Sequence, residues 1–157
     1  MKKISLRPYN SFGVDAYAKD FVSVESEKEI VEFLEKNKSK SLLILGGGTN
    51  ILFKKDVDYP VLKIDIKGIE IINEDDNEVL ISVGAGENWN ELVWWCIEND
   101  FGGIENLVSI PGNVGSAPIQ NIGAYGKEIS EVIENCRGIF RDNCSSVSYT
   151  HLTLPTI

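Results

Sequence analysis

The sequence predicts an α+β fold built from two small lobes that share a core. Two amphipathic helix patterns alternate with several strand patterns, and glycine-rich turns follow three of the strands. The 157 residues suffice for one ordinary domain. With 43% hydrophobic and 25% charged residues, the composition is typical of a globular chain and excludes disordered, collagen-like and disulfide-rich classes. We expect the lobes to divide near residue 67, into residues 1–66 and 67–143.

A β-α-β unit opens the pattern of the first lobe. Residues 21–24 (Phe-Val-Ser-Val) form a short strand pattern. Ser26 and Glu29 follow at capping-box spacing, so we expect each side chain to accept the free backbone N–H of the other. Apolar residues then recur at helical spacing over residues 27–37. Residues 42–45 (Leu-Leu-Ile-Leu) are an uninterrupted apolar run, which is typical of a buried strand.

Three more strands and a second helix follow. Residues 61–66 and 69–72 alternate with period two, as half-buried strands do. Residues 79–83 form another strand pattern, and residues 89–99 form a helix pattern. One face of this helix carries apolar residues at i, i+3, i+4 and i+7, namely Trp89, Leu92, Val93 and Cys96.

The pattern then changes to a long loop. Residues 101–126 are rich in glycine, include two prolines and show no sustained period. Such a loop in a compact chain is usually functional or disordered, and its Ile, Val, Leu and Tyr content argues against disorder. Beyond it we expect a short helix at residues 129–133 and a strand near residues 138–140.

The last fourteen residues differ in composition from the rest. Residues 144–157 contain no Lys, Arg, Asp or Glu, and six of them are Ser or Thr. We interpret this segment as non-native sequence, with a polar tail as the alternative, and leave it out of the expected fold.

Charge and cysteine content exclude several classes of function. The formal net charge is −9, and such a field disfavours binding to a nucleic-acid backbone. No apolar run has the length of a membrane span, and the N-terminus lacks a secretory signal. Three cysteines without CxxC spacing favour reduced thiols in the cytoplasm over a zinc site. The single histidine, His151, argues against a histidine-based metal or catalytic site.

The first glycine-rich turn is a candidate binding site. Residues 46–50 (Gly-Gly-Gly-Thr-Asn) directly follow a predicted strand, where α/β sheets bind ligands. Glycine allows positive φ and close approach of the backbone, and successive N–H groups suit a pyrophosphate. The spacing matches neither GxGxxG nor the P-loop. We therefore predict a dinucleotide cofactor bound in a non-Rossmann manner, with a simple tight turn as the alternative.

The second candidate is the uncharged segment of the long loop. Residues 110–126 contain four glycines, two prolines and no charged side chain. Small uncharged residues can surround a flat heteroaromatic ring and bind its edge through backbone groups. A surface Ω-loop is the alternative, although such a loop would normally carry Asp, Glu or Lys.

Four motifs together resemble a known family. Residues 10–13 (Asn-Ser-Phe-Gly), 45–53, 83–89 and 110–126 occur in the order and spacing found in the UDP-N-acetylenolpyruvoylglucosamine reductases, flavoenzymes of bacterial peptidoglycan synthesis. The resemblance covers residues 10 to about 143. It implies a two-lobed FAD-binding fold of the PCMH type, similar to vanillyl-alcohol oxidase.

The resemblance also implies roles for particular residues. The pyrophosphate of FAD would lie on residues 46–50, the flavin would lie against the long loop, and Tyr125 would face the substrate. Attachment would be non-covalent, because the only histidine lies in the suspect tail. The residues implied to bind FAD are Gly46, Gly47, Gly48, Thr49, Asn50, Ile110, Pro111, Gly112, Gly115, Ser116, Ile119 and Gly123.

In the family, NADPH reduces the flavin, which then passes hydride to a UDP-sugar enolpyruvyl substrate while a serine donates a proton. An arginine and a glutamate assist. The positions matching these three residues would lie past residue 157, so we assign no catalytic residue and expect a fragment without the substrate domain. Phe140-Arg141-Asp142 imitates the family's Tyr-Arg-Asp motif about twenty residues too early, and we do not assign its role to Arg141.

Three functions thus remain open on the sequence. The leading one is a cytoplasmic, monomeric, FAD- and NADPH-dependent reductase of cell-wall synthesis, present here as an inactive portion. The second is an FAD-binding module without turnover. The third is a flavin-free α/β domain whose glycine turns are only structural.

Overall fold

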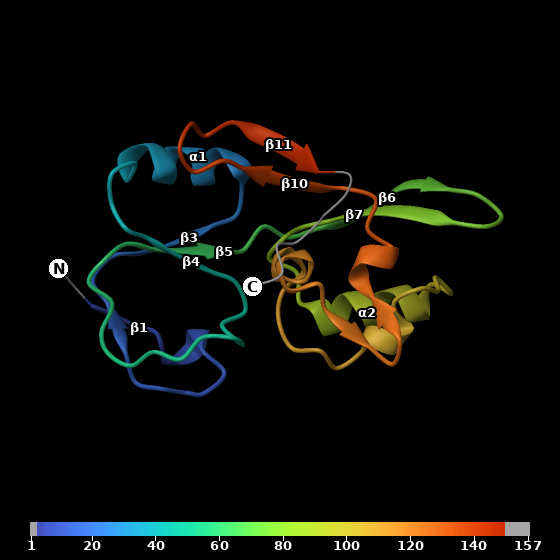
Figure 1. Ribbon diagram of the computed structural model, residues 1–157, viewed down its shortest axis with the longest axis horizontal. Helices are drawn as coiled ribbons and strands as arrows, with labels where there is room; N and C mark the ends of the chain where they lie inside the picture. Colours follow the sequence, from blue (N-terminus) through green and yellow to red (C-terminus); the bar gives the residue numbers. More distant parts are fainter. Residues whose placement is uncertain (1–2, 150–157) are drawn as a thin grey trace.

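The computed structural model describes residues 3–149 and has the predicted α+β architecture. Two lobes lie side by side (Figure 1). The first carries the helix α1 (Glu27–Lys36) and the second carries α2 (Trp89–Glu98). Among the described residues, no helix is long and apolar enough to span a membrane.

A three-stranded parallel sheet forms the centre of the first lobe. Its strands are β3 (Phe21–Val24), β4 (Leu43–Leu45) and β5 (Val61–Ile64), in the order β3-β5-β4. The predicted β-α-β unit therefore forms, but β5 lies between its two strands. Because β5 is central, Val61 and Leu62 are both fully buried, and the expected half-buried alternation is wrong there.

The expected burial of β4 is wrong in part for the same reason. As an edge strand, β4 leaves Ile44 58% exposed, while Leu45 is buried. An apolar run thus identified the strand but not its place in the sheet.

The start of α1 follows the predicted capping box on one side only. The Ser26 hydroxyl accepts the Glu29 N–H at 3.3 Å, as expected. The Glu29 carboxylate instead accepts the N–H of Glu25, at 2.7 Å, rather than that of Ser26. The reciprocal bond was therefore predicted one residue too late.

Two apolar clusters cover the faces of this sheet. Under α1, Phe33 packs with Val24 and Leu62. On the other face, the N-terminal segment contributes a short antiparallel pair, β1 (Ile4–Ser5) with β2 (Tyr17–Ala18). The cluster on that face consists of Leu6, Ala16, Ala18, Leu45, Phe53, Val57 and Val61.

The second lobe packs α2 against an antiparallel hairpin. The hairpin is β6 (Ile69–Glu74) with β7 (Val79–Val83), and Figure 1 shows it extending away from the body of the molecule. The predicted buried face of α2 is confirmed: its four apolar residues are at most 4% exposed. Trp89 also donates its Nε1–H to the Leu107 carbonyl at 2.9 Å.

The long loop has only short regular pieces, as its lack of a period indicated. It contains single 3₁₀ turns at Glu105–Leu107, Val114–Ser116 and Pro118–Gln120. A two-stranded hairpin, β8 (Gly123–Ala124) with β9 (Lys127–Glu128), follows. The helix expected at 129–133 is one 3₁₀ turn, Ile129–Glu131.

The chain then forms a hairpin beside α1. The strand expected near 138–140 is β10 (Cys136–Ile139), and it pairs antiparallel with β11 (Ser146–Tyr149). Figure 1 shows this hairpin next to α1, where Arg137 contacts Glu27. Leaving all of residues 144–157 out of the fold was therefore wrong for β11. Residues 150–157, with His151, lie outside the described residues.

Residues 65–68 connect β5 of the first lobe to β6 of the second lobe. This crossing is hydrogen-bonded to residues 84–87. Gly84 and Gly86 donate their N–H groups to the carbonyls of Gly68 and Ile66, both at 2.8 Å. The Glu87 carboxylate accepts the Gly68 N–H at 2.7 Å.

Candidate functional site

Residues 46–50 form a turn at the carboxyl end of β4, at the edge of the first lobe. Gly48 is buried and has φ +67°. A Cβ on Gly48 would stand 2.0 Å from the carbonyl oxygen of Tyr9. The packing of the fold thus requires glycine here, independently of any ligand.

This turn meets the long loop of the second lobe. A Cβ on Gly47 would stand 2.6 Å from Oδ1 of Asn113 and 3.2 Å from the Cα of Gly112. The Thr49 hydroxyl donates to the Pro111 carbonyl at 3.4 Å. The structure therefore brings residues 46–50 together with residues 110–116, the first part of the 110–126 stretch that the sequence singled out.

A third glycine-rich stretch, residues 84–86 at the end of β7, joins them. The Gly115 N–H donates to the Ala85 carbonyl at 2.9 Å, and the Asn113 side chain donates to the Gly86 carbonyl at 2.9 Å. A Cβ on Gly115 would stand 2.7 Å from the Cβ of Ala85. We call residues 46–50, 84–86 and 110–116 the three glycine segments; they converge where the two lobes meet.

The first glycine segment presents backbone N–H groups without protein acceptors. Within residues 3–149, the N–H groups of residues 47–50 donate no hydrogen bond to a backbone or side-chain acceptor. A Cβ on Gly46 would have no atom within 4 Å, so the backbone there borders open space. Successive free N–H groups in such a turn can bind an anion such as a pyrophosphate.

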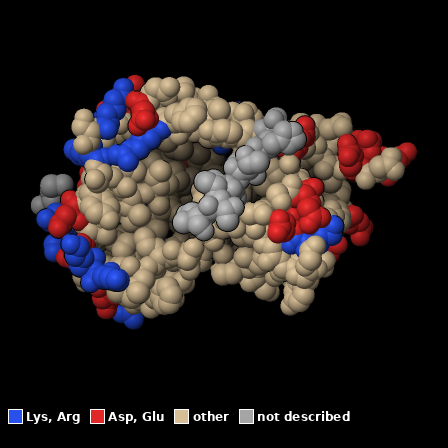
Figure 2. Space-filling model, viewed as in Figure 1, with Lys and Arg blue, Asp and Glu red and all other residues tan. Residues whose placement is uncertain are grey.

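The hollow between the two lobes carries little charge on the face that Figure 2 shows, although the Lys67 ammonium and the Glu87 carboxylate lie beside residues 84–86. The face in Figure 2 is hollowed between the two lobes, with Lys, Arg, Asp and Glu mostly toward the outer ends. Around the central hollow the visible atoms mostly belong to uncharged residues. An uncharged rim suits a flat ring bound by backbone groups better than it suits a small ion.

The N-terminal segment supports the first glycine segment from the opposite side. The buried Asn10 side chain donates to the carbonyls of Leu6 and Val14, at 2.8 and 3.1 Å, and accepts the Val14 N–H at 2.9 Å. This closes a loop in which Ser11 N–H donates to the Gly48 carbonyl at 3.0 Å. Asn10 and Ser11 belong to one of the four motifs that carry the family resemblance, but they were not predicted to be site residues.

Asn113 was also missed, although it lies inside the predicted loop. Its neighbours Gly112 and Gly115 were chosen because glycine permits a close backbone approach. An asparagine flanked by such glycines is itself an indication, since its amide can bind the backbones that come close.

The remaining predicted residues lie on exposed parts of the long loop. Ile119 is 71% exposed and Tyr125 is 91% exposed. Tyr125 and Gly126 have φ of 53° and 78° and form the two-residue turn between β8 and β9. Gly123 lies in β8 of the same hairpin. Among the described residues, no hydrogen bond joins these side chains to the three glycine segments.

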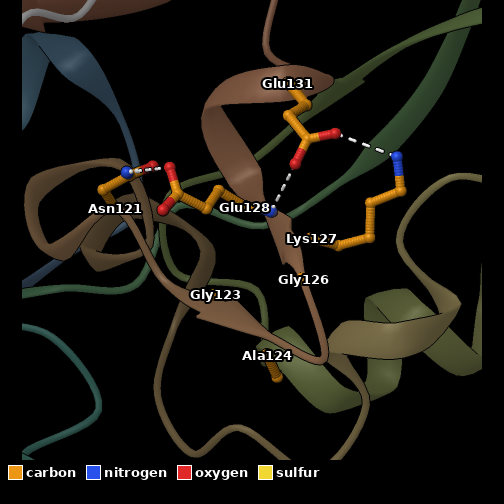
Figure 3. Close-up of a pocket in the computed structure, with 7 residues that line it drawn as sticks. All are labelled: Asn121, Gly123, Ala124, Gly126, Lys127, Glu128 and Glu131. Carbon is orange, nitrogen blue, oxygen red and sulfur yellow. Dashed lines mark hydrogen bonds and ion pairs between the residues drawn. The ribbon is translucent and has the colours of Figure 1, made fainter.

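A cavity of about 560 Å³ lies on this hairpin rather than at the three glycine segments (Figure 3). Its polar side chains bind one another. Lys127 Nζ lies 2.9 Å from the Glu131 carboxylate, which also accepts the Glu128 N–H at 2.9 Å, and Asn121 donates to Glu128 at 2.7 Å. The Lys127 hydrogen bond lowers the pKa of Glu131. Since these groups are paired internally, we place the candidate site at the three glycine segments. The cavity is lined by Asn121, Gly123, Ala124, Gly126, Lys127, Glu128 and Glu131.

Arg141 lies elsewhere in the molecule. Its guanidinium donates to the Lys40 carbonyl, just beyond the end of α1. This contact is with the segment after α1 in the first lobe and not with the three glycine segments. Among residues 3–149, no group of three His, Cys, Asp or Glu side chains is arranged to hold a metal ion.

Comparisons with known proteins agree with this geometry. The family described as "FAD binding domain" matches residues 18–142. The UDP-N-acetylenolpyruvoylglucosamine reductase of Flavobacterium johnsoniae is 48% identical over 147 residues, which cover 94% of this chain and 44% of that protein. The enzyme of the same name from Amoebophilus asiaticus is 50% identical over 140 residues, or 88% of this chain and 41% of that protein. The chain thus spans less than half the length of these relatives.

A solved structure shares the fold. The crystal structure of UDP-N-acetylenolpyruvylglucosamine reductase (MurB) from Thermus caldophilus superposes with a TM-score of 0.73 at 22% identity, covering 95% of this chain and 52% of that one. The resemblance predicted from the four motifs is confirmed, and so is the two-lobed FAD-binding fold of the PCMH type.

Proposed function

The chain belongs to the FAD binding domain family, and from this membership we propose that it binds FAD non-covalently where its two lobes meet. The observation that carries the proposal is the convergence of the three glycine segments, where the N–H groups of residues 47–50 have no acceptor within residues 3–149. A pyrophosphate offers acceptors for such groups without needing a cationic side chain.

The residues present fit the cofactor. Gly46 has open space beside it, so a phosphate can approach the backbone there. The uncharged residues 110–116 offer small side chains and backbone groups to a flat ring. Our proposed contacts are Gly46, Gly47, Gly48, Thr49 and Asn50 for the pyrophosphate, and Ile110, Pro111, Gly112, Gly115, Ser116, Ile119 and Gly123 for the flavin.

We further propose that a protein carrying this chain is an FAD-dependent reductase that acts on UDP-N-acetylenolpyruvoylglucosamine, with NADPH as hydride donor. The names of its relatives support this substrate. Bound FAD would supply a hydride acceptor and donor. This chain would bind and orient the cofactor. The glycine segments hold FAD, the uncharged surface around the hollow between the lobes excludes water from it, and Tyr125 lies on the substrate side.

The proposed setting is peptidoglycan synthesis in the cytoplasm, by a monomer that does not bind nucleic acid. All three cysteines are free, which supports a reducing compartment. The formal net charge of −9 supports the absence of nucleic-acid binding.

A second candidate is an FAD-binding module that does not turn the substrate over by itself. Arg141 favours it, because the arginine of the sequence Phe140-Arg141-Asp142 binds the Lys40 carbonyl and is not at the proposed flavin site.

Titration of the purified chain with FAD tests the binding proposal. We expect saturable binding with a change in flavin fluorescence, and no saturable change would overturn it. Oxidation of NADPH is then followed with and without UDP-N-acetylenolpyruvoylglucosamine. Substrate-dependent oxidation would support the reductase for residues 1–157 alone, whereas flavin binding without it would support the second candidate.

A further inference from the structure

We propose that Asn113 is a positioning residue, which fixes the spacing of the three glycine segments and thereby the shape of the cofactor site. The inference rests on the proposed binding of FAD. All three segments are in contact at Asn113. It belongs to residues 110–116, its side-chain Nδ2 donates to the backbone of residues 84–86, and its side-chain Oδ1 faces residues 46–50.

The side-chain amide of Asn113 is held on both sides. Its Nδ2 donates to the Gly86 carbonyl at 2.9 Å in a partly buried position. Its Oδ1 stands 2.6 Å from the place of a Cβ on Gly47, so the amide lies against the backbone of the first lobe. An amide thus fills the space between a turn of one lobe and a turn of the other.

The backbone on either side of Asn113 is also fixed. The Trp89 N–H donates to the Gly112 carbonyl at 3.0 Å, and the Val114 N–H donates to the Glu87 carbonyl at 2.9 Å. These bonds anchor the main chain within the second lobe, which leaves the side chain to set the distance to the first lobe.

The Gly86 carbonyl connects this contact to the crossing between the lobes. It accepts the Asn113 amide and also the Lys67 ammonium, at 2.6 Å. Lys67 belongs to the crossing and lies 3.6 Å from the Glu87 carboxylate. Among the described residues, removing the Asn113 amide would leave the Gly86 carbonyl with one donor, the Lys67 ammonium.

The geometry gives Gly47 a reason to be glycine that does not involve a ligand. A methyl group at residue 47 would displace the Asn113 amide and break its bond to Gly86. Gly47→Ala and Asn113→Ala should therefore act through one shared contact, and their effects should not add. The Gly112 backbone, 3.2 Å from the same point, keeps some strain in the double variant.

Asn90 provides a matched control. Its Oδ1 accepts the Ser109 N–H at 2.8 Å, so it also ties the long loop to the second lobe through one side-chain hydrogen bond. Asn90 has no hydrogen bond to the three glycine segments among the described residues. Asn113→Ala and Asn90→Ala thus each remove one anchor of the same loop, but only the first alters the proposed site.

The first experiment compares FAD binding by wild type, Asn113→Ala, Asn113→Asp and Asn90→Ala, together with the absorption spectrum of the bound flavin. Asn113→Asp keeps the shape but replaces the donor by a carboxylate. We expect both Asn113 variants to lose about tenfold or more in FAD affinity and to shift the flavin spectrum. Asn90→Ala should stay within about threefold of wild type with an unchanged spectrum. Equal affinity and spectrum of wild type and the Asn113 variants would overturn the inference.

The second experiment needs no FAD. Urea unfolding of wild type, Gly47→Ala, Asn113→Ala and the double variant measures their coupling. The inference expects the double variant to be no less stable than Gly47→Ala, and additive losses would overturn it. If the wild-type chain binds no FAD, the proposed function fails, and with it the role of Asn113 toward a cofactor. The unfolding experiment then still decides the contact between Asn113 and Gly47.

Discussion

The backbone of Gly48 packs directly on the carbonyl group of Tyr9, which lies 2.0 Å from the position of a Cβ on Gly48. Residue 48 also has φ +67°, a backbone conformation in which residues other than glycine are strained. The contact joins the N-terminal segment to the turn after β4. The three consecutive glycines of this turn therefore have three different roles, because Gly46 borders open space and Gly47 borders Asn113.

Gly48→Ala should destabilise the fold itself. Left-handed strain of about 1–2 kcal/mol and overpacking of about 1–3 kcal/mol both apply, so we expect a loss of about 2–5 kcal/mol in the free energy of unfolding. Gly13→Ala is the control, since Gly13 has φ +62° but open space around it and should show the strain alone. Urea unfolding of both variants tests this, and equal losses would contradict the packing argument.

Gly46→Val should instead act on the ligand. Gly46 has neither a positive φ nor an atom within 4 Å of a Cβ, so the variant should unfold at the same urea concentration as wild type. A branched side chain there would block approach to the backbone N–H groups, and FAD affinity should fall about tenfold or more. Fluorescence titration with FAD measures the effect. Undiminished affinity would remove residues 46–50 from the site.

Trp89→Phe should weaken the anchor between α2 and the long loop. Trp89 is 2% exposed, and its Nε1–H is the donor to the buried Leu107 carbonyl. Leaving that carbonyl without a donor costs about 1–3 kcal/mol. Trp94→Phe, at a position 51% exposed, should change stability by no more than about 0.5 kcal/mol. Unfolding followed by far-UV circular dichroism compares the two, and similar losses would argue against this role.

Cys96 should make stability fall in alkaline solution. Burial raises the pKa of the Cys96 thiol above its ordinary value of 9.0, because the folded state disfavours the thiolate. This contribution is fully present below the ordinary value and is lost as the pH rises through the raised one. As the pH rises above the ordinary value of 9.0, wild type should therefore lose more stability than Cys96→Ala. Parallel pH profiles of the two proteins would contradict this.

Periodicity in the sequence was sufficient to predict the second helix and the strands, but not which elements lie beside each strand in the sheet. The face of α2 was predicted residue by residue because a helix buries the same stripe wherever it packs. The sequence predicted a buried strand at β4 and a half-buried one at β5, yet Leu62 is buried on the central strand and Ile44 is exposed on the edge strand. Strand order depends on pairing between distant segments, which the composition of a single strand does not encode.

The sequence singled out the two stretches of the candidate site, but not the packing contacts of their residues. Residues 46–50 and 110–126 were proposed as two binding elements, and the structure brings residues 46–50 into contact with residues 110–116; their binding of FAD stays a prediction. The glycines were explained by a ligand, whereas Gly47 and Gly48 are explained by Asn113 and Tyr9. Both partners are remote in sequence and have no periodic pattern. Residues 144–157 were left out of the expected fold because they carry no charge, yet residues 146–149 form β11 and pair with β10.

The hydrogen bonds between residues 65–68 and 84–87 make the molecule one cooperative unit. A linker between independent domains would have free amides, exchange its hydrogens early and be cut first by a protease. Here the Gly68 N–H donates to the Glu87 carboxylate at 2.7 Å, and the Gly86 N–H donates to the Ile66 carbonyl at 2.8 Å. Separating the lobes at the crossing therefore requires these hydrogen bonds to break. The two lobes should consequently melt in a single transition, and the most protected amides should include those of the crossing that joins them.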